Sequence, residues 1–303
     1  MGNIWAPEVV VEKELAIALI NKQFPELSIQ SIKEIGEGFD NTIYAVNDIY
    51  VFRFPRREIA GELMETEAVL LPKIQQLLPI KIPVPVFFGQ KSQDYRWSFL
   101  GYSYLEGKMP HKLTQENRIK LIGPLAAFLK ALHSISIKDL KGVPVPYDKL
   151  GRLDIGKRKA GMMEKLEALC LLDNSQVFEK ARDYCQGIEH IEVPCEHVLV
   201  HGDLHLGNML VNEGKELTAI IDWGDVHIGH RAVDLAIVYS LIPAEEREAF
   251  YAVYGKTDSV TLELARFKAV YTLVLLLAYA LDKKELLLYE EAKTSLAIAL
   301  SSS

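Results

Sequence analysis

The sequence contains few cysteines and no hydrophobic run long enough to suggest a membrane span. Its three cysteines, Cys170, Cys185 and Cys195, are odd in number and lack metal-ligand spacing. We therefore expect free or buried thiols in a reducing, cytoplasmic setting rather than a disulfide framework. The most apolar run, residues 269–281, is shorter than the roughly 20 residues that cross a bilayer. We expect a buried helix there and no association with a membrane.

The N-terminus lacks the basic start and apolar stretch of a signal peptide. Basic residues are also in deficit, because 34 Lys and Arg stand against 41 Asp and Glu and give a net charge of −7. This deficit argues against nucleic acid as a partner, since binding to its backbone depends on clustered Lys and Arg. Negative charge suits a cationic ligand, although it also simply keeps an ordinary cytosolic protein soluble.

Secondary-structure patterns divide the sequence into a strand-rich first third and a helical remainder, with no internal repeat. A length of 303 residues, 49% of them apolar, is sufficient for one bilobal domain or two smaller ones. We expect strands near 29–35, 42–46, 49–54, 83–86 and 97–104, after a first helix at 8–23 and around a second at 59–78. Helices are expected at 114–133, 157–171, 177–188, 231–241, 243–254, 260–281 and 284–300. This is an α+β pattern.

The most informative stretch is residues 201–208, His-Gly-Asp-Leu-His-Leu-Gly-Asn, followed by Ile-Asp-Trp-Gly at 221–224. Phosphoryl transfer needs a base for the acceptor hydroxyl and oxygen ligands for Mg²⁺. Kinase catalytic loops place an Asp five positions before an Asn and a second Asp at a later strand end. Asp203, Asn208 and Asp222 reproduce this spacing, and the short apolar runs beside them predict strands that fix the loop ends. We interpret Asp203 as the base and Asn208 and Asp222 as metal ligands.

An isolated Asp and Asn in a glycine-containing loop would more often be turn formers. Here His-Gly-Asp, the five-residue gap, a predicted hairpin and Asp-Trp-Gly coincide, and the segment resembles the aminoglycoside phosphotransferase and choline kinase superfamily. The resemblance covers nearly the whole sequence. It implies a bilobal, protein-kinase-like fold, with a five-stranded antiparallel sheet and a helix in an N-terminal lobe (1–104). A mostly helical C-terminal lobe (105–303) would follow.

The resemblance also implies an activity, namely transfer of the γ-phosphate of ATP or GTP, with Mg²⁺, to a hydroxyl of a small molecule. No long activation segment follows Gly224, and the sequence passes through residues 225–230 directly into a predicted helix. Protein kinases need a peptide-binding segment at this point, so its absence favours a small acceptor. His201 is expected to brace the catalytic loop, and Asp234 the loop that follows Gly224.

Nucleotide contacts are expected in the N-terminal lobe. Gly36 and Gly38 would let the backbone approach the phosphates, although a hairpin loop with two glycines is structural more often than not. On the third predicted strand, Arg53 stands where related enzymes usually carry Lys. The exchange is not conservative, because the guanidinium is larger and planar. Either Arg53 contacts the phosphates with altered geometry, or one of the neighbouring arginines contributes, Arg56 or Arg57.

Two further nucleotide assignments rest on the resemblance. Glu67 on the second helix is expected to pair with the strand cation, in preference to Glu62 and Glu65. At the hinge that follows the fifth strand, the backbone carbonyl of Ser103 and the backbone N–H of Leu105 would bind the purine. These backbone contacts do not distinguish ATP from GTP.

The acceptor is less defined by the sequence. An aminoglycoside carries several ammonium groups and needs several carboxylates, for which we consider Asp225, Glu245, Glu246 and Glu248. Solvated helix surfaces carry such acids more commonly. Residues 52–57, Phe-Arg-Phe-Pro-Arg-Arg, also look like macrolide phosphotransferases, but those enzymes commonly carry His where this protein has Asn208. An aminoglycoside is therefore favoured over a macrolide or another small hydroxylated amine.

We weigh two other interpretations of the sequence. A nucleotide-binding pseudokinase acting as an interaction module is opposed by the intact Asp203, Asn208 and Asp222 but not by Arg53. Zinc is rejected, because a loop rich in His and Asp already has a more economical explanation as a Mg²⁺ site. The sequence leaves the oligomeric state open.

Overall fold

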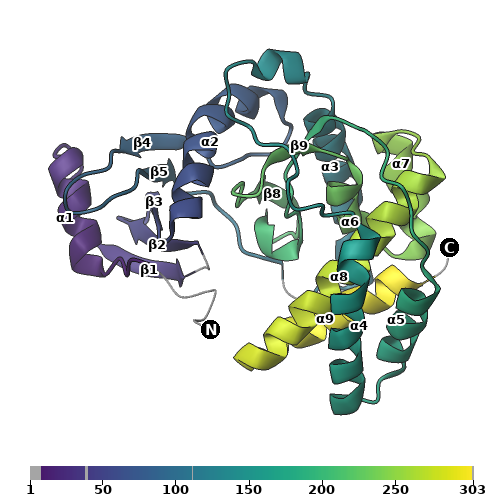
Figure 1. Ribbon diagram of the computed structural model, residues 1–303. Helices are drawn as coiled ribbons and strands as arrows, with labels where there is room; N and C mark the ends of the chain where they lie inside the picture. The colour runs from purple at the N-terminus through teal and green to yellow at the C-terminus, as the bar shows by residue number, and fades with distance from the viewer. Residues whose placement is uncertain (1–7, 38–39, 111, 302–303) are drawn as a thin grey trace. The chain divides into compact units, whose positions relative to one another are not determined.

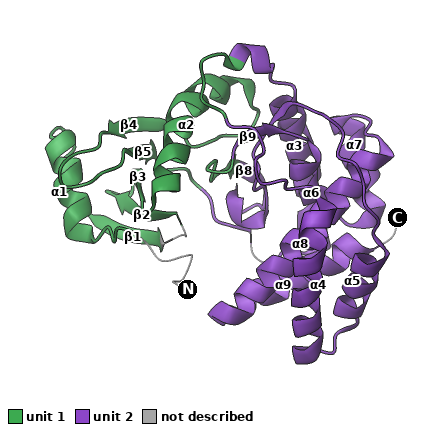
Figure 2. Ribbon diagram, viewed as in Figure 1, with its two compact units in different colours: residues 1–106, 140–145, 219–225 green, residues 107–139, 146–218, 226–303 purple. Residues whose placement is uncertain are grey.

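The computed structural model describes residues 8–37, 40–110 and 112–301. The protein forms two compact units (Figure 2). The first consists of residues 1–106, 140–145 and 219–225, and the second of residues 107–139, 146–218 and 226–303. The sequence suggested a single division after residue 104. In the structure, residues 140–145 and 219–225 belong to the first unit although they come after this division.

The first unit is built on the expected five-stranded sheet (Figure 1). Its strands are β1 (Ile32–Glu37), β2 (Asn41–Val46), β3 (Tyr50–Pro55), β4 (Pro85–Gly89) and β5 (Phe99–Ser103). They lie in the order β1-β2-β3-β5-β4, and every neighbouring pair is antiparallel. Asn47, Asp48 and Ile49 join β2 to β3, and Asn47 and Asp48 have φ angles of 57° and 55°. Asn and Asp accept this left-handed conformation more readily than other residues with a Cβ, and it closes a tight turn in which the Ile49 N–H donates to the Val46 carbonyl at 3.1 Å.

Alternation along β3 separates a hydrophobic face from a polar one. Phe52 and Phe54 are fully buried in the core formed with α1 (Lys13–Gln23), and the ring of Phe54 stacks 4.8 Å from that of Phe99. Arg53, between them, points to the opposite face, where α2 (Glu58–Ile74) packs on β3, β4 and β5. A short 3₁₀ turn (Gln75–Leu77) continues α2. A charged residue can therefore sit between two core phenylalanines.

Hydrogen bonds attach both returning segments to the rest of the first unit. The Thr66 hydroxyl on α2 donates to the Pro144 carbonyl at 3.0 Å. The N–H of Ile220 donates to the Lys81 carbonyl, also at 3.0 Å. Because Ile220 ends strand β8 (Leu217–Ile220), the second contact fixes the strand end that precedes Asp222.

The second unit is mostly helical (Figures 1 and 2). Its helices are α3 (Gln115–His133), α4 (Ile155–Leu172), α5 (Gln176–Gly187), α6 (Ala232–Leu241), α7 (Arg247–Tyr254), α8 (Ser259–Lys283) and α9 (Leu286–Leu300). Strands β6 (Val198–Val200) and β7 (Met209–Val211) flank the loop at residues 201–208, and β7 pairs with β8 as the predicted hairpin. All three cysteines are free.

Helix α8 contains the most apolar run of the sequence. By length and composition alone it could cross a membrane. Half of its most apolar window is buried inside the fold, and the helix packs against α4, α6 and α9. The buried helix predicted over residues 269–281 is thus part of the core of the second unit.

One strand was missed by the sequence analysis. His227–Gly229 form β9, which pairs antiparallel with β6, in the segment where a loop leading directly into α6 was expected. Three residues are too few to show an alternating pattern. The strand forms because β6 lies beside it, and that proximity is a tertiary effect.

A buried carboxylate fixes the loop after β6. Asp234 on α6 is fully buried and accepts hydrogen bonds from the N–H groups of His201, at 2.8 Å, and Gly202, at 2.9 Å. Its second partner is His133 on α3, whose Nε2 lies 3.1 Å away and whose Nδ1 lies 2.7 Å from the Tyr254 hydroxyl. The prediction that Asp234 braces the loop after Gly224 was therefore wrong, since the carboxylate holds the loop that begins at His201.

We expect Asp234→Asn to lower the free energy of unfolding at pH 7 by about 3 kcal/mol, because an amide cannot replace both accepting oxygens of the buried carboxylate. Despite burial, His133 and the backbone donors hold the pKa of Asp234 below its ordinary value of 3.8. Its stabilisation is fully present above the unfolded pKa and is lost as pH falls through the folded pKa. Urea unfolding at pH 7 and below pH 4 should show the difference between the proteins shrinking with acid.

Asp183→Asn, at an exposed position of α5, is the matched control and should change stability little at either pH. Equal destabilisation of Asp234→Asn at pH 7 and at acid pH would contradict the assigned role of the charge.

Candidate active site

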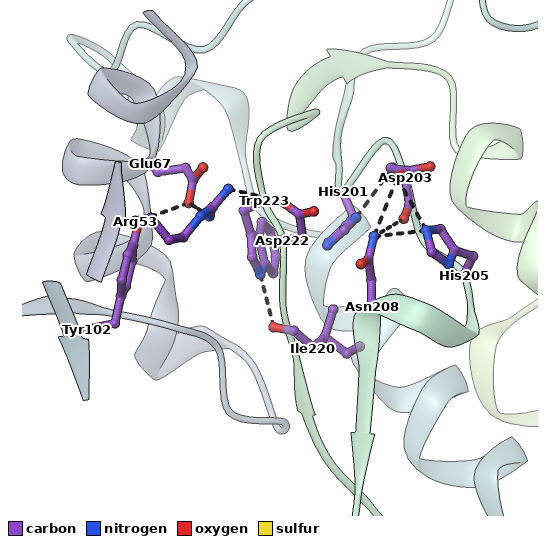
Figure 3. A network of polar contacts seen from close by, with 10 residues as sticks. All are labelled: Arg53, Glu67, Tyr102, His201, Asp203, His205, Asn208, Ile220, Asp222 and Trp223. Carbon is purple, nitrogen blue, oxygen red and sulfur yellow. Dashed lines mark hydrogen bonds and ion pairs between the residues drawn. The ribbon is translucent and has the colours of Figure 1, made fainter. Parts of the chain in front are cut away.

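The loop after β6 carries Asp203, whose side chain is 42% exposed and accessible to a ligand (Figure 3). His205 Nε2 lies 3.4 Å from Asp203 Oδ2. The Nδ1 atom of the same ring accepts the N–H of Gly207 at 3.0 Å, so in the neutral ring Nε2 carries the proton. His205 therefore presents a donor to the Asp203 carboxylate.

Asn208 is anchored through one end of its side-chain amide only. Its Nδ2 donates to the Asp203 carbonyl at 2.9 Å and lies 3.5 Å from Asp203 Oδ2. Across residues 8–37, 40–110 and 112–301, no hydrogen bond to Asn208 Oδ1 is present. A hard cation binds this kind of amide oxygen.

Neighbouring basic groups keep Asp203 ionised. Burial by itself would raise the pKa of the carboxyl, but the hydrogen bond from His205 and the electrostatic influence of His205, Lys268 and His201 lower it well below its ordinary value of 3.8. Asp203 is therefore a weak base that stays negatively charged throughout the neutral range.

The surroundings of Asp203 combine one predicted brace with two residues that the sequence analysis did not select. His201 is fully buried, and its Nδ1 accepts the N–H of Asp203 at 3.4 Å, a long contact consistent with the predicted bracing role. His205 could have been found from its position two residues after Asp203. Lys268 lies on α8, 65 residues further along the sequence, and no local pattern connects it to the loop.

Arg53 lies between two carboxylates in the first unit (Figure 3). Its Nη1 is 2.8 Å from Glu67 Oε2 and its Nη2 is 3.0 Å from Asp222 Oδ1. The Tyr102 hydroxyl donates to Glu67 Oε2 at 3.2 Å. The structure thus brings together Arg53, Glu67 and Asp222, whereas Glu62 is exposed on α2.

Burial makes this cluster strongly coupled. Glu67 is 1% exposed, and burial raises the pKa of its carboxyl even though Arg53 opposes the shift. Desolvation alone would lower the pKa of Arg53, but attraction to Glu67 and Asp222 outweighs it and raises that pKa. The guanidinium therefore stays charged. With one cation and two carboxylates, the cluster carries a net negative charge when all three groups are ionised.

The Asp-Trp-Gly segment after β8 positions Asp222 by backbone conformation and by an anchor. Asp222 has φ +62°, and its side chain is 54% exposed. Trp223 is fully buried, and its indole N–H donates to the Ile220 carbonyl at 3.1 Å. The buried ring holds the segment while the aspartate next to it remains accessible.

The other predicted nucleotide contacts lie in β1 and after β5. Gly36 pairs with Ile43 beside a bulge in β1, and a Cβ there would make only an ordinary 3.7 Å contact. Packing among the described residues therefore does not require glycine at 36. Gly38 lies outside the residues that the structure describes. Ser103 is the exposed end of β5, and no acceptor for the N–H of Leu105 occurs within the described part of the protein.

The neighbouring arginines have surroundings of their own. Arg57 forms an ion pair with Asp40. Arg56 is buried, and its backbone N–H donates to the Asp40 carbonyl at 2.7 Å. The arginine that joins the carboxylates of Glu67 and Asp222 is Arg53.

Two of the predicted acceptor-binding acids, Glu245 and Glu246, lie away from the loop at residues 201–208. Asp225 is exposed and belongs to the first unit. Glu245 and Glu246 lie in the 3₁₀ turn Ala244–Glu246, after the C-terminal end of α6, whose N-terminal turn holds Asp234. The 10 residues of α6 span about 15 Å at 1.5 Å per residue. The structure therefore does not bring Glu245 and Glu246 to Asp203.

Comparison with known proteins places this geometry in a family. Residues 31–269 match the sequence profile of the phosphotransferase enzyme family, APH. An aminoglycoside 3'-phosphotransferase from Escherichia coli is 26% identical over 186 residues, which are 59% of this chain and 65% of the length of that protein.

Two solved structures have the same fold. The GDP complex of wild-type aminoglycoside 2'-phosphotransferase-IIIa is 25% identical, with a TM-score of 0.69 over 95% of this chain and 98% of that one. Macrolide 2'-phosphotransferase type I is 19% identical, with a TM-score of 0.59 over 95% and 98% of the two proteins, and this likeness concerns the fold alone. The predicted kinase-like α+β fold is thereby confirmed. Because the family profile covers well over half of the sequence, the protein belongs to the phosphotransferase enzyme family.

Proposed function

We propose that this phosphotransferase moves the γ-phosphate of ATP or GTP to a hydroxyl of a small molecule in the cytoplasm. The observation that carries the proposal is the loop after β6. There an ionised, partly exposed Asp203 lies beside Asn208, whose amide oxygen is uncommitted in the described structure. A carboxylate and a free amide oxygen in this arrangement suit an acceptor hydroxyl and a phosphate-bound cation.

Asp203 would orient the acceptor hydroxyl and take its proton as the bond to phosphorus forms. The low pKa of Asp203 makes early proton abstraction unfavourable. Its main contribution would therefore be positioning, with proton transfer late in the reaction, as in a loose phosphoryl-transfer transition state. His205 and His201 would hold the carboxylate and its loop in place. No covalent phosphoenzyme is needed.

Asn208 and Asp222 would hold Mg²⁺, and the donor chemistry of both residues fits this ion. Asn208 offers Oδ1, and Asp222 belongs to a cluster with a net negative charge. The metal would neutralise charge on the phosphates of the bound nucleotide.

Arg53 would contact the nucleotide phosphates in place of the usual lysine, with Glu67 fixing its position. Gly36, and by resemblance Gly38, would allow close approach of the backbone. The Leu105 N–H and the Ser103 carbonyl would receive the purine at the end of β5.

We infer an aminoglycoside as the most favoured acceptor, because relatives of this protein are named for aminoglycosides and the net charge of −7 suits a cationic ligand. A macrolide is the second candidate, supported by one structural relative and by residues 52–57. Asp225 remains a candidate contact to the acceptor. Glu245 and Glu246 lie beyond α6, and this position does not favour either residue as a contact to the acceptor.

Asp203→Asn should lower the rate of phosphoryl transfer by about 10²- to 10⁴-fold, the usual contribution of a positioned base. Nucleotide affinity should stay close to that of the unaltered protein. Nucleoside diphosphate release in a coupled assay and calorimetric titration with nucleotide would measure the two effects. A near-normal rate in Asp203→Asn would remove Asp203 from its role, and Glu213→Gln, an exposed acid in the β7–β8 turn, is the control.

Arg53→Met should weaken nucleotide binding about 10- to 100-fold, because a charge-assisted contact to phosphate is lost. Arg53→Lys should retain most of the affinity. Since Arg53→Met leaves Glu67 buried without its cation, the double variant Arg53→Met/Glu67→Leu separates binding from instability. Arg57→Met removes a nearby cation paired with Asp40. A larger loss from Arg57→Met than from the double variant would move the phosphate contact to Arg57.

A panel of aminoglycosides, macrolides and small amino alcohols, tested with ATP and GTP, should identify one class that stimulates Mg²⁺-dependent nucleoside diphosphate release. We expect the aminoglycosides to do so, and the Asp203→Asn variant to abolish the stimulation. Nucleotide binding without stimulation by any compound would favour the pseudokinase interpretation.

A further inference from the structure

The second unit contains a small cavity of about 250 Å³ away from the catalytic loop. It lies among α5, α8, the end of α6, the start of α7 and the C-terminal end of α9, all within one compact unit (Figure 2). The lining residues are Tyr184, Tyr239, Arg247, Leu262, Glu263, Arg266 and Ser301. Two arginines in so small a space require an electrostatic explanation.

Arg247 is a buried cation that binds backbone carbonyls. It is 7% exposed, and its Nε and Nη2 donate to the carbonyls of Ile242 and Ile298 at 3.3 and 2.7 Å. Its guanidinium lies 4.6 Å from the Tyr239 ring centroid. In the described residues no carboxylate forms an ion pair with Arg247, whereas buried charges in proteins are normally paired.

Arg266 repeats the arrangement from α8. Its Nε and Nη2 donate to the carbonyls of Ala299 and Leu300 at 3.0 and 3.1 Å, and its guanidinium lies 5.4 Å from the Tyr184 ring centroid. No ion pair to it occurs in the part of the protein that the structure describes. Arg266 thus caps the end of α9 with two nitrogens, whereas Arg247 binds one carbonyl of α9 and one at the end of α6. For both arginines, no partner of Nη1 occurs among the described residues.

The like charges in this cavity are not balanced. Desolvation and the charge of Arg266 lower the pKa of Arg247, although Tyr239, Tyr251 and Glu245 oppose the shift. Capping of carbonyls accounts for Nε and Nη2 but not for two neighbouring cations that form no ion pair among the described residues. Glu263 lines the cavity at an exposed position and forms no ion pair with either arginine in the described residues.

A third donor is present in the same cavity. The Tyr184 hydroxyl is buried and has no hydrogen-bond partner in the described structure. A buried hydroxyl without a partner costs free energy, so such groups usually mark a missing ligand atom or water.

We propose that this cavity binds a small tetrahedral oxyanion, namely inorganic phosphate or the phosphate group of a small monoester. The anion would accept hydrogen bonds from Nη1 of both arginines and from Tyr184. Two guanidinium groups match the charge of a dianion and the geometry of its oxygens. A volume of about 250 Å³ is below the range of pockets for drug-sized ligands and therefore suits a small anion better than a whole nucleotide or an aminoglycoside. The site is independent of the proposed catalytic function.

Calorimetric titration of the full-length protein with inorganic phosphate tests the proposal, with Tyr184→Phe as the decisive variant. The substitution removes only an unpartnered hydroxyl, so stability without anion should not fall. Phosphate affinity should decrease about three- to tenfold, as expected for one hydrogen bond. Arg266→Gln should decrease it by about tenfold or more, because a charged donor is lost. Glu263→Gln should increase it, because a like charge leaves the cavity.

The double variant Arg53→Met/Glu67→Leu controls for phosphate bound at the proposed nucleotide site, and it should retain the binding that Tyr184→Phe weakens. Binding of glycerol phosphate in preference to inorganic phosphate would identify the monoester as the ligand. Absence of phosphate and monoester binding, or affinities unchanged by both Tyr184→Phe and Arg266→Gln, would overturn the proposal. Acetate binding as tightly as either phosphate would overturn the assignment of a tetrahedral oxyanion as the ligand.

Discussion

The conformation of the loop at residues 201–208 depends on one buried carboxylate. Asp234 accepts the N–H groups of both His201 and Gly202, while His133 and Tyr254 extend the network to α3 and α7. Gly202 has φ +90°, a value that side-chain-bearing residues rarely adopt. The buried hydrogen bonds offset the cost of this turn, and Asp203 and Asn208 follow it in a fixed orientation. The buried carboxylate of Asp234 thus has a structural role, whereas the carboxylate of Asp203 is partly exposed.

Arg53 shows how a strongly coupled cluster can be built on a simple strand pattern. Alternation along β3 places two phenylalanines in the aromatic core and the arginine on the α2 side. Its two terminal nitrogens contact two different carboxylates, one almost fully buried and one half exposed. A lysine has a single nitrogen and lacks this planar fork. The arginine therefore links Glu67 to Asp222 through two separate nitrogens, which a lysine could not do.

Much of the fold and part of the site could be predicted from local sequence patterns. The five strands of the sheet, the long helices and the spacing of Asp203, Asn208 and Asp222 depend on periodicity and on short segments. Glu67 was selected correctly as the partner of Arg53, because the resemblance distinguished it from its neighbours on α2. The roles of these residues in binding and catalysis remain predictions.

Features that depend on distant segments could not be predicted. Strand β9 needs β6 beside it, and the link from Asp234 to the loop at His201 joins residues 33 positions apart. Lys268 approaches Asp203 from a helix that begins more than 50 residues later. The two arginines of the small cavity come from α7 and α8, and both bind carbonyls near the end of α9. Local sequence patterns do not specify such long-range contacts.

The Asn47-Asp48 turn has a consequence for how this protein tolerates insertions and deletions. With both residues at positive φ, the turn sets the pairing of Val46 with Tyr50 and hence every later pair between β2 and β3. One extra residue absorbed into β3 would exchange its two faces. The phenylalanines would then point toward α2, and the arginine would enter the aromatic core. Length changes at this exposed hairpin are therefore more damaging than most substitutions within it. The position of Arg53 beside Glu67 and Asp222 depends on the length of this turn.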